Sequence, residues 1–447
     1  MRVWIANPLA ILAPGAEGGV VVEHGCIVEC VAAGARPAAP VDETFDASAH
    51  VVLPGLINTH HHMYQTLTRA HPDAINKELF PWLEALFPIW ASRLNPDNFR
   101  LATRLALTEL LMSGCTTVSD HQYLYPPGLD NAMDIQAEEA AALGIRMTLT
   151  RGSLNLTEDE GGNAPGGAVQ DVDHILADCE RVIGRYHDLR PGAMTQVALA
   201  PCAPFNVSKR LMVETAALAE RCNCRMHTHL AETRDEIDFC REKFACRPVD
   251  YLEEVGWMNE RVWLAHGIHF NEDEIGRLGR ARVGVCHCPT SNMVLASGQC
   301  RTNELEAAGS PVGLGVYGSA SNDNSNLMES VRHAMMSNRL LYGASAVTHL
   351  DALRWATEGS ARCLGRDDIG AIAPGKRADL GMFTLDELRF SGAGDPLAAL
   401  VLCGAHRADR VMVEGRWRVI DGMPVNMDIV RLRREHGAAA KAFLTSL

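Results

Sequence analysis

Two members of a three-histidine run, His60 and His62, have the type and spacing of a metal-binding pair. They follow an apolar segment that ends in Pro-Gly, at residues 51–55. On a β-strand alternate side chains share a face, so His60 and His62 lie on one side and His61 on the other. Two imidazoles in this arrangement can bind one metal ion, although polar residues that merely end a strand remain the alternative.

The middle of the chain alternates short apolar runs with longer amphipathic segments. Eight runs are expected as strands, at residues 51–62, 116–119, 146–150, 196–200, 225–229, 262–266, 283–286 and 312–316. Eight strand–helix repeats predict an α/β fold, specifically a (β/α)8 TIM-type barrel. Such barrels carry their catalytic groups at the C-terminal ends of the strands, so polar residues at those ends are the candidates for chemistry.

Polar side chains follow three of the other runs. The fifth run ends in His229 with Glu232 three residues beyond it, the sixth ends in His266, and the eighth leads to Asp323. Three histidines and one aspartate with an open position for water suit zinc or iron(II), and such a metal lowers the pKa of its bound water to roughly 7. Glu232 is better placed as a proton carrier than as a ligand, and Asp323 offers a second acid–base group.

Composition argues against several classes of function. The 447 residues are 47% hydrophobic, carry a net charge of -14 and show no basic patch, which argues against nucleic-acid binding. The 14 cysteines have no regular spacing, which fits a reducing cytoplasm better than a disulfide framework. No apolar run approaches the roughly 20 residues of a membrane span, and the first residues do not form a signal peptide. We therefore expect a cytoplasmic protein without a membrane partner.

The sequence pattern at both ends of the chain differs from the pattern in the middle. Residues 1–53 and 372–426 contain short strand candidates separated by turn residues. We expect them to form one small β-sandwich domain, with the barrel, residues 54–371, inserted between them. Residues 427–447 have helical spacing and many charges, so a C-terminal surface helix is expected there.

Several segments together carry a resemblance to a known family. They are residues 54–62, 227–232, 266–267, 288–292 and 370–380, together with Asp323. They resemble the amidohydrolase superfamily over nearly the whole chain, and its deaminase branch in particular. Residues 62–65, residues 120–123 and the Gly161-Gly162 loop look most like 8-oxoguanine deaminases, and hydroxytriazine hydrolases have similar motifs. The resemblance also implies a small heterocyclic substrate and a homo-oligomer.

The resemblance assigns a role to each candidate. One divalent metal, zinc in the first place and iron(II) as the alternative, would be held by His60, His62, His229 and Asp323. Glu232 would move a proton from the attacking hydroxide to a ring nitrogen, and His266 would hydrogen-bond the hydroxide and the forming oxyanion. Asp323 would take a proton from the water and pass it to departing ammonia. Gln65 would hydrogen-bond the edge of a purine.

Two departures from the family pattern restrict which reaction and which substrate are expected. Members with two metals bridge them with a modified lysine after the fourth strand, but residues 197–204 contain no lysine. A single metal favours ring deamination over hydrolysis of cyclic amides. Guanine deaminases have Arg-Phe where this chain has Pro204-Phe205, so plain guanine is disfavoured. Cys202 and Arg151 are further candidates for substrate contacts, although a space-filling cysteine and an ordinary salt bridge explain them equally well.

The expected activity is therefore metal-dependent hydrolytic deamination of a modified purine, with 8-oxoguanine converted to uric acid and ammonia. A hydroxytriazine, a pterin or guanine is the alternative substrate of the same site. A barrel that binds metal or purine without turnover is disfavoured, because a pure binding protein has no need of Glu232, His266 and Asp323 together.

Overall fold

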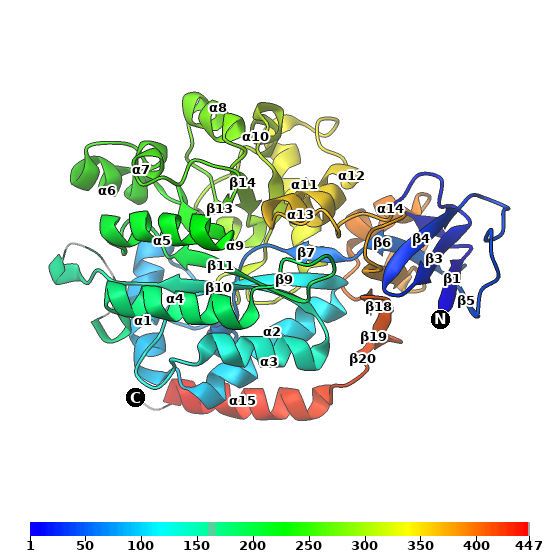
Figure 1. Cartoon of the computed structure of the whole chain (residues 1–447), viewed down its shortest axis with the longest axis horizontal. Helices are drawn as coiled ribbons and strands as arrows, with labels where there is room; N and C mark the ends of the chain where they lie inside the picture. Colours follow the sequence, from blue (N-terminus) through cyan, green and yellow to red (C-terminus); the bar gives the residue numbers. More distant parts are fainter. Residues whose placement is uncertain (161, 163, 165, 446–447) are drawn as a thin grey trace.

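Eight parallel strands form the central sheet of the protein (Figure 1). The computed structural model describes residues 1–160, 162, 164 and 166–445, so Gly161 of the Gly161-Gly162 motif lies outside the described residues. In spatial order the strands are β7 (Leu56–Asn58), β9 (Cys115–Gln122), β10 (Arg146–Ser153), β11 (Thr195–Pro201), β12 (Arg225–Leu230), β13 (Val262–His266), β14 (Gly284–His287) and β15 (Val312–Leu314). Because every neighbouring pair in this order is parallel, the C-terminal ends of all eight strands face the same way.

Two short strands close this sheet into a barrel. β8 (His61–His62) pairs in parallel with β16 (Tyr317–Gly318), so that His61 lies opposite Tyr317. The backbone N–H of Thr59 also donates to the carbonyl of Leu314, at 2.9 Å. The first and last strands are thus joined, and the predicted (β/α)8 barrel is confirmed.

Helices follow the barrel strands and cover the outside of the sheet (Figure 1). They are α2 (Pro96–Met112), α3 (Ala132–Leu143), α4 (Val172–Tyr186), α5 (Lys209–Cys222), α6 (Arg234–Phe244), α7 (Pro248–Glu254), α8 (Glu272–Arg280), α9 (Pro289–Val294), α10 (Thr302–Ala308), α11 (Leu327–Tyr342), α12 (His349–Arg354) and α13 (Ser360–Cys363). Polar caps fix where several of them begin, because a side-chain oxygen satisfies N–H groups that the first turn leaves free. Asn95, Asp171 and Ser208 do this for α2, α4 and α5.

The first expected strand is divided between two sheets. Residues 51–62 were expected to form one barrel strand, but β6 (His50–Pro54) pairs with β17 (Leu380–Thr384) outside the barrel, and β7 begins only at Leu56. Gly55 lies at the break, where an added Cβ would be 2.1 Å from the Oγ1 atom of Thr116. A residue with a side chain does not fit there, so the chain passes from one sheet to the other at a glycine.

The two ends of the chain form a second body with two sheets. One contains β4 (Cys26–Val31), β3 (Gly19–Glu23), β1 (Arg2–Ala6) and β5 (Glu43–Asp46); the other contains β2 (Ala10–Ile11), β6, β17, β18 (Arg410–Val413), β19 (Arg416–Ile420) and β20 (Met423–Pro424). Apolar residues of both sheets, among them Ile5, Val22, Val52, Leu380 and Met412, share one buried cluster. This agrees with the predicted small sandwich. We propose three divisions of the chain. Residues 1–53 and 372–426 form the sandwich, residues 54–371 form the barrel, and residues 427–447 contain the C-terminal helix.

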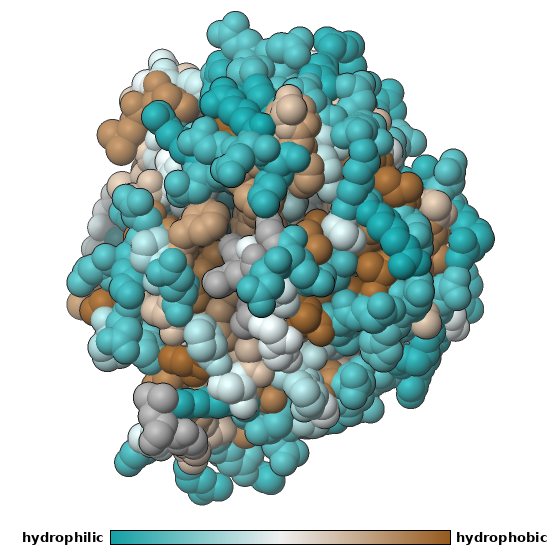
Figure 2. Space-filling model, turned by 90° about the vertical axis from the view of Figure 1, so that its left-hand side faces the viewer, coloured by the Kyte–Doolittle hydropathy of each residue, from teal (hydrophilic) through white to brown (hydrophobic). Residues whose placement is uncertain are grey.

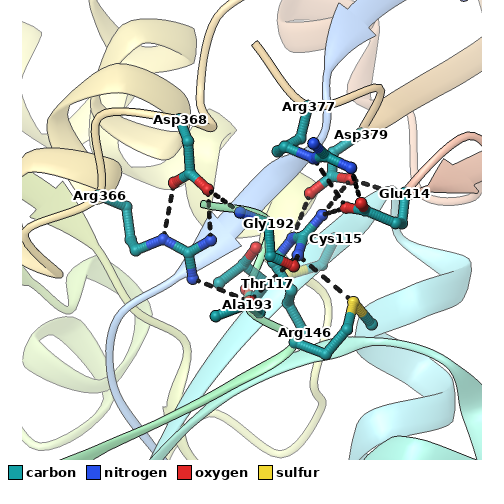
Figure 3. A network of polar contacts seen from close by, with 11 residues as sticks. Cys115, Thr117, Arg146, Gly192, Ala193, Arg366, Asp368, Arg377, Asp379 and Glu414 are labelled. Carbon is teal, nitrogen blue, oxygen red and sulfur yellow. Dashed lines mark hydrogen bonds and ion pairs between the residues drawn. The ribbon is translucent and has the colours of Figure 1, made fainter. Parts of the chain in front are cut away.

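A buried ion network joins the barrel to the sandwich (Figure 3). Arg146, the first residue of β10, donates from Nε and Nη2 to the two carboxylate oxygens of Asp379, at 2.7 and 3.0 Å. Its Nη2 group also pairs with Glu414, which lies between β18 and β19. Arg146 and Asp379 are almost fully buried. A planar guanidinium held by two carboxylates fixes the orientation of one body against the other.

The remaining helices lie at the edges of this framework. The 3₁₀ helix η1 (Met63–Thr68) and helix α1 (Leu79–Arg93) follow β8, and α14 (Pro396–Ala399) belongs to the C-terminal part. Helix α15 (Ile429–Thr445) packs on α2. The Nε2 atom of its His436 lies 3.1 Å from the hydroxyl oxygen of Thr66. None of the helices formed by the described residues is long and apolar enough to span a bilayer.

Candidate metal centre and active site

Four buried histidines converge at the C-terminal end of the barrel. His60 and His62 come from the segment after β7, His121 from the end of β9, and His229 from β12. One ring nitrogen of each lies within 4.8 Å of those of the other three. Parallel strands make this possible, because side chains at the ends of different strands meet at one rim.

Hydrogen bonds fix which nitrogen of His62 and His229 carries the proton. The Nδ1 atom of His62 lies 2.9 Å from the carbonyl of His121, and Nδ1 of His229 lies 2.8 Å from the carbonyl of Cys202. A carbonyl oxygen only accepts, so both Nδ1 atoms are protonated and both Nε2 atoms carry lone pairs. These Nε2 atoms are 3.2 Å apart. Two lone pairs at this distance repel each other unless a cation lies between them.

The same reasoning applies to the other two histidines. His227 donates from Nδ1 to the carbonyl of Trp263 at 2.8 Å, so its Nε2 accepts a hydrogen bond from Nδ1 of His60, 2.6 Å away. This leaves Nε2 of His60 without a hydrogen-bond partner among the residues that the structure describes. His121 donates from Nε2 to the carbonyl of Ala200 at 2.8 Å, which leaves its Nδ1 unpaired. Each of the four rings thus has one unprotonated nitrogen, and its other nitrogen makes a hydrogen bond that fixes the orientation of the ring. Such a set of nitrogens fits a divalent metal.

Burial keeps these imidazoles neutral. It lowers the pKa of His229 to about 4, and it lowers the pKa of His60, His62 and His121 well below the ordinary value, with the neighbouring histidines acting in the same direction. A neutral imidazole is the form that binds a metal. The site is therefore ready to bind metal at neutral pH.

Glu232 and His266 lie beside the histidine cluster. The Oε2 atom of Glu232 is 3.4 Å from Nε2 of His266, whose Nδ1 lies 2.9 Å from the Oδ1 atom of Asn292. Burial raises the pKa of Glu232 well above its usual range, and the charge of Glu236 raises it further. A carboxyl group whose pKa lies above its usual range has the property required of a general acid–base group.

The structure corrects the expected position of Asp323. Its side chain is exposed, and its Oδ1 atom accepts a hydrogen bond from the backbone N–H of Ala70, at 2.6 Å. It does not belong to the group of converging ligand atoms. The reason is the course of the chain: the eighth strand reaches the rim at Tyr317, and Asp323 lies six residues further on, in a loop that leaves the barrel. We therefore do not keep Asp323 as a ligand or proton carrier.

Tyr317 occupies the rim position where a carboxylate was expected. Its ring is buried, and its centroid lies 5.1 Å from that of His60, 4.8 Å from that of His62 and 4.7 Å from that of His266. Burial raises the pKa of the phenol well above its usual range, with the nearby carboxylate of Glu232 as the next cause. Within the part of the chain that the structure describes, the converging group is made of histidines alone.

Three residues of the site were missed by sequence reasoning, namely His121, His227 and Tyr317. The signal for His121 was its place at the end of the second apolar run, and the signal for His227 was its alternation with His229 on one strand. Tyr317 gave no such signal, because tyrosine is more often a core residue than a site residue. Its backbone φ of 65° is unusual for a residue with a large side chain.

A small cavity adjoins the histidine cluster. It has a volume of about 20 Å³ and is lined by Leu79, Leu83, Phe87, Tyr123, Cys202, Phe205, Asn206, His229, Glu232 and Tyr317. This volume holds about one water molecule. Figure 2 views the end of the molecule that carries α1, where hydrophobic side chains lie near the centre of a mostly hydrophilic face. The closed site thus has room for a water molecule next to Glu232, but not for a ring system.

The three expected substrate contacts have different positions. Cys202 lines the cavity, with its Sγ atom 3.7 Å from Nδ1 of His229. Gln65 is buried in η1 and accepts from the backbone N–H of Ala320 at 3.3 Å, and it does not line this cavity. Arg151 pairs with Asp178 at 2.8 Å, and its other N–H groups donate to the carbonyl of Gly152 and the side chain of Gln170. It therefore forms an ordinary salt bridge, which was the alternative to a substrate contact.

Comparisons with known proteins agree with this geometry. A model of the amidohydrolase family matches residues 51–418. The chain is 58% identical over 446 residues to an 8-oxoguanine deaminase of Pseudomonas aeruginosa, covering 99% of both chains, and 36% identical to an isoxanthopterin deaminase of an unknown prokaryotic organism, covering 90% of this chain and 88% of the other. Among solved structures, an atrazine chlorohydrolase from Arthrobacter aurescens complexed with zinc superimposes with a TM-score of 0.93 at 31% identity, covering 98% of this chain and 100% of the other.

Proposed function

Because the chain belongs to the amidohydrolase family, we propose that it hydrolyses the bond between a ring carbon and an exocyclic amino group, with 8-oxoguanine as the substrate. The oxygen of a water molecule replaces the amino group on the ring carbon, and the amino group leaves as ammonia. The products are therefore uric acid and ammonia. The observation that carries this proposal is the 58% identity, over nearly the full length, to an 8-oxoguanine deaminase. A barrel rim with unprotonated histidines and a raised-pKa carboxyl group supplies the chemistry that such a reaction needs.

We propose that His60, His62 and His229 hold one divalent metal through Nε2, with His121 beside them through Nδ1. The metal, when bound, lowers the pKa of a coordinated water to roughly 7 and so provides a nucleophile at neutral pH. Neutral imidazole ligands and the zinc in a similar solved structure favour zinc, and iron(II) accepts the same ligands.

Glu232 and His266 carry the proton transfers in this proposal. Glu232 takes a proton from the attacking water and gives one to a ring nitrogen of the substrate, which its raised pKa permits. His266 donates from Nδ1 to Oδ1 of Asn292, so its unprotonated Nε2 orients the attacking water by accepting a hydrogen bond from it. The phenol of Tyr317 remains neutral and offers a hydrogen-bond donor at the same rim.

Substrate entry requires the cavity walls to move. A bicyclic purine is several times larger than a space of about 20 Å³. Leu79, Leu83 and Phe87 on α1, together with Phe205, form the apolar side of the wall. We propose that α1 moves outward to admit the ring and closes over it, which excludes bulk water during the reaction.

Cellular context follows from the same proposal. All 14 cysteines are free, as expected in a reducing cytoplasm. We place the protein in the cytoplasm, with a small heterocyclic substrate, as a homo-oligomer like the family that it resembles.

The variant Glu232→Gln tests the mechanism. We expect kcat for ammonia release from 8-oxoguanine to fall by about 10²–10⁴-fold, because an amide cannot carry the proton. Metal content, measured by elemental analysis on the same samples, should stay at the wild-type level. Glu242→Gln, an exposed change on α6, is the matched control and should keep full activity. Undiminished turnover by Glu232→Gln would remove Glu232 from the mechanism.

A second candidate is deamination of a pterin or hydrolysis of a triazine on the same groups. It is favoured by the 36% identity to an isoxanthopterin deaminase and by the superposition on an atrazine chlorohydrolase. The identity to these proteins is much lower than to the 8-oxoguanine deaminase, so we rank this candidate second.

A further inference from the structure

A second cavity lies at the opposite end of the barrel from the histidines. Its volume is about 510 Å³, within the range of small-molecule sites. It opens among the N-terminal ends of β10 to β13 and the segment that follows α13. Its lining contains five arginines against two acidic residues; the arginines are Arg225, Arg261, Arg282, Arg362 and Arg366, and the acidic residues are Glu260 and Asp367. We call it the arginine cavity.

Three of these arginines have carboxylate partners. Arg366 is held by Asp368, with Nε and Nη2 at 2.7 and 2.8 Å from its two oxygens (Figure 3). Arg282 lies 3.6 Å from Glu260, in an exposed pair. Arg362 lies 3.6 Å from Glu358 on its own helical turn. The charges of these three residues are therefore at least partly balanced by the protein.

Arg225 and Arg261 are different. Among the residues described, no carboxylate lies within ion-pair distance of either guanidinium, and the Nε atom of each is buried without a hydrogen-bond partner. Arg225 makes one hydrogen bond, from Nη2 to the backbone carbonyl of Glu260 at 2.7 Å. Burial lowers the pKa of Arg225 to about 10; the charge of Glu260 acts in the opposite direction, and that of Arg261 in the same direction as burial. With this pKa Arg225 remains cationic at neutral pH.

Arg225 and Arg261 are half-buried, so each loses part of its hydration without gaining a counter-ion. Buried charges in proteins are paired with an opposite charge or bind a ligand, because an unpaired ion loses its hydration without compensation. Here two neighbouring cations share one cavity in a protein whose net charge is -14. A planar guanidinium group can donate two parallel hydrogen bonds to two oxygens of one phosphate. A single water molecule cannot replace this pair of hydrogen bonds.

We propose that the arginine cavity binds a phosphate-bearing small molecule, with Arg225 and Arg261 as the groups that recognise the phosphate. The site is separate from the metal centre. Arg225 is the first residue of β12 and His229 the fifth, so four strand steps of about 3.3 Å place them about 13 Å apart. Arg261 directly precedes β13, which ends in His266. The ligand would therefore bind at the start of two strands whose far ends carry the reaction.

Titration of the metal-loaded protein with inorganic phosphate tests this proposal. We expect saturable binding of one phosphate per chain by calorimetry and a rise in Tm of about 1–3 °C, because a ligand that binds only the folded state stabilises it. Sodium chloride at equal ionic strength controls for screening of the two arginines by salt. A purine nucleoside monophosphate is titrated in parallel. Tighter binding of the nucleotide would identify a nucleotide site, and equal binding a site for free phosphate.

Arg261→Gln gives the decisive comparison. It removes one of two repelling cations, whose buried Nε atom has no hydrogen-bond partner among the described residues, so Tm without phosphate should be unchanged or higher. The phosphate-dependent rise in Tm should disappear. Arg210→Gln, at an exposed position on α5 outside the cavity, should keep the full response. No response in the wild type, or an equal response in Arg261→Gln, would overturn the proposal whether or not the protein is a deaminase.

Discussion

At the scale of single residues, strand ends were a good guide to histidines and a poor guide to the carboxylate. His60, His62 and His229 lie where alternation along a strand places them, because the backbone of a strand decides the direction of its side chains. Asp323 lies in a loop, and nothing in its neighbouring residues shows which way such a loop turns. Tyr317 reaches the site because β16 pairs with β8, a contact between segments more than 250 residues apart in the chain.

Replacing Tyr317 by aspartate tests whether the histidine-only set limits metal affinity. We expect Tyr317→Asp to bind zinc at least tenfold more tightly, measured by competition with a chelator, because the new carboxylate attracts the cation at short range. Tyr317→Asn has the same size without the charge and should not show this gain. Equal zinc affinity of the aspartate and asparagine variants would mean that position 317 does not face the metal.

At the scale of elements, periodicity predicted the barrel well and its connection to the sandwich poorly. Seven of the eight expected runs coincide with barrel strands, since buried parallel strands are continuous apolar segments. The first run was wrongly extended across Gly55, because an apolar strand of one sheet followed by an apolar strand of another looks like one long strand. The change of sheet shows only in the strand pairing, since β6 pairs with β17 and β7 with β9.

The ion network between barrel and sandwich should be essential for stability. Asp379→Asn leaves the buried guanidinium of Arg146 with one carboxylate fewer, and breaking a buried pair costs about 3–5 kcal/mol. We expect a Tm lower by several degrees in differential scanning calorimetry. Asp188→Asn, which breaks an exposed pair with Arg190, should change Tm by less than about a degree. Similar Tm values for the two variants would show that the network adds nothing beyond an ordinary surface pair.

At the scale of the whole molecule, composition gives the net charge of the chain but not where positive charge collects. The net charge of -14 gives no hint that five arginines line one cavity, because they come from four separate segments of the chain. The small sandwich was predictable because short strands with turn residues dominate both chain ends. How the two bodies dock was not, since it depends on Arg146 meeting Asp379 across 233 residues of sequence.

Burial of neutral histidines makes the whole molecule sensitive to acid. Burial lowers the pKa of His61, His227 and His287 to about 3 and that of His436 to about 4, whereas unfolded histidine titrates near 6.5. Between these values the unfolded chain binds more protons than the folded one. Stability is therefore fully present above about pH 6.5 and falls as the pH drops towards 4, by about 1.4 kcal/mol per pH unit for each such histidine.

Thermal unfolding of the metal-free protein at a series of pH values measures this effect. Tm should be constant from pH 8 to 7 and should fall steeply from pH 6 to 4.5. Added zinc should raise Tm most at neutral pH, where protons do not compete for the histidine ligands. A Tm that stays constant down to pH 4.5 would contradict the neutral, buried state of these histidines.

The central claim is that a single metal at the histidine rim supports deamination of 8-oxoguanine. The most direct measurement is ammonia and uric acid formed from 8-oxoguanine by a sample whose metal content is determined at the same time, beside guanine, isoxanthopterin and a hydroxytriazine. We predict one metal per chain, equal amounts of ammonia and uric acid, and the highest kcat/KM for 8-oxoguanine. No product from 8-oxoguanine with the metal in place, or a higher kcat/KM for a pterin or a triazine, would contradict the claim.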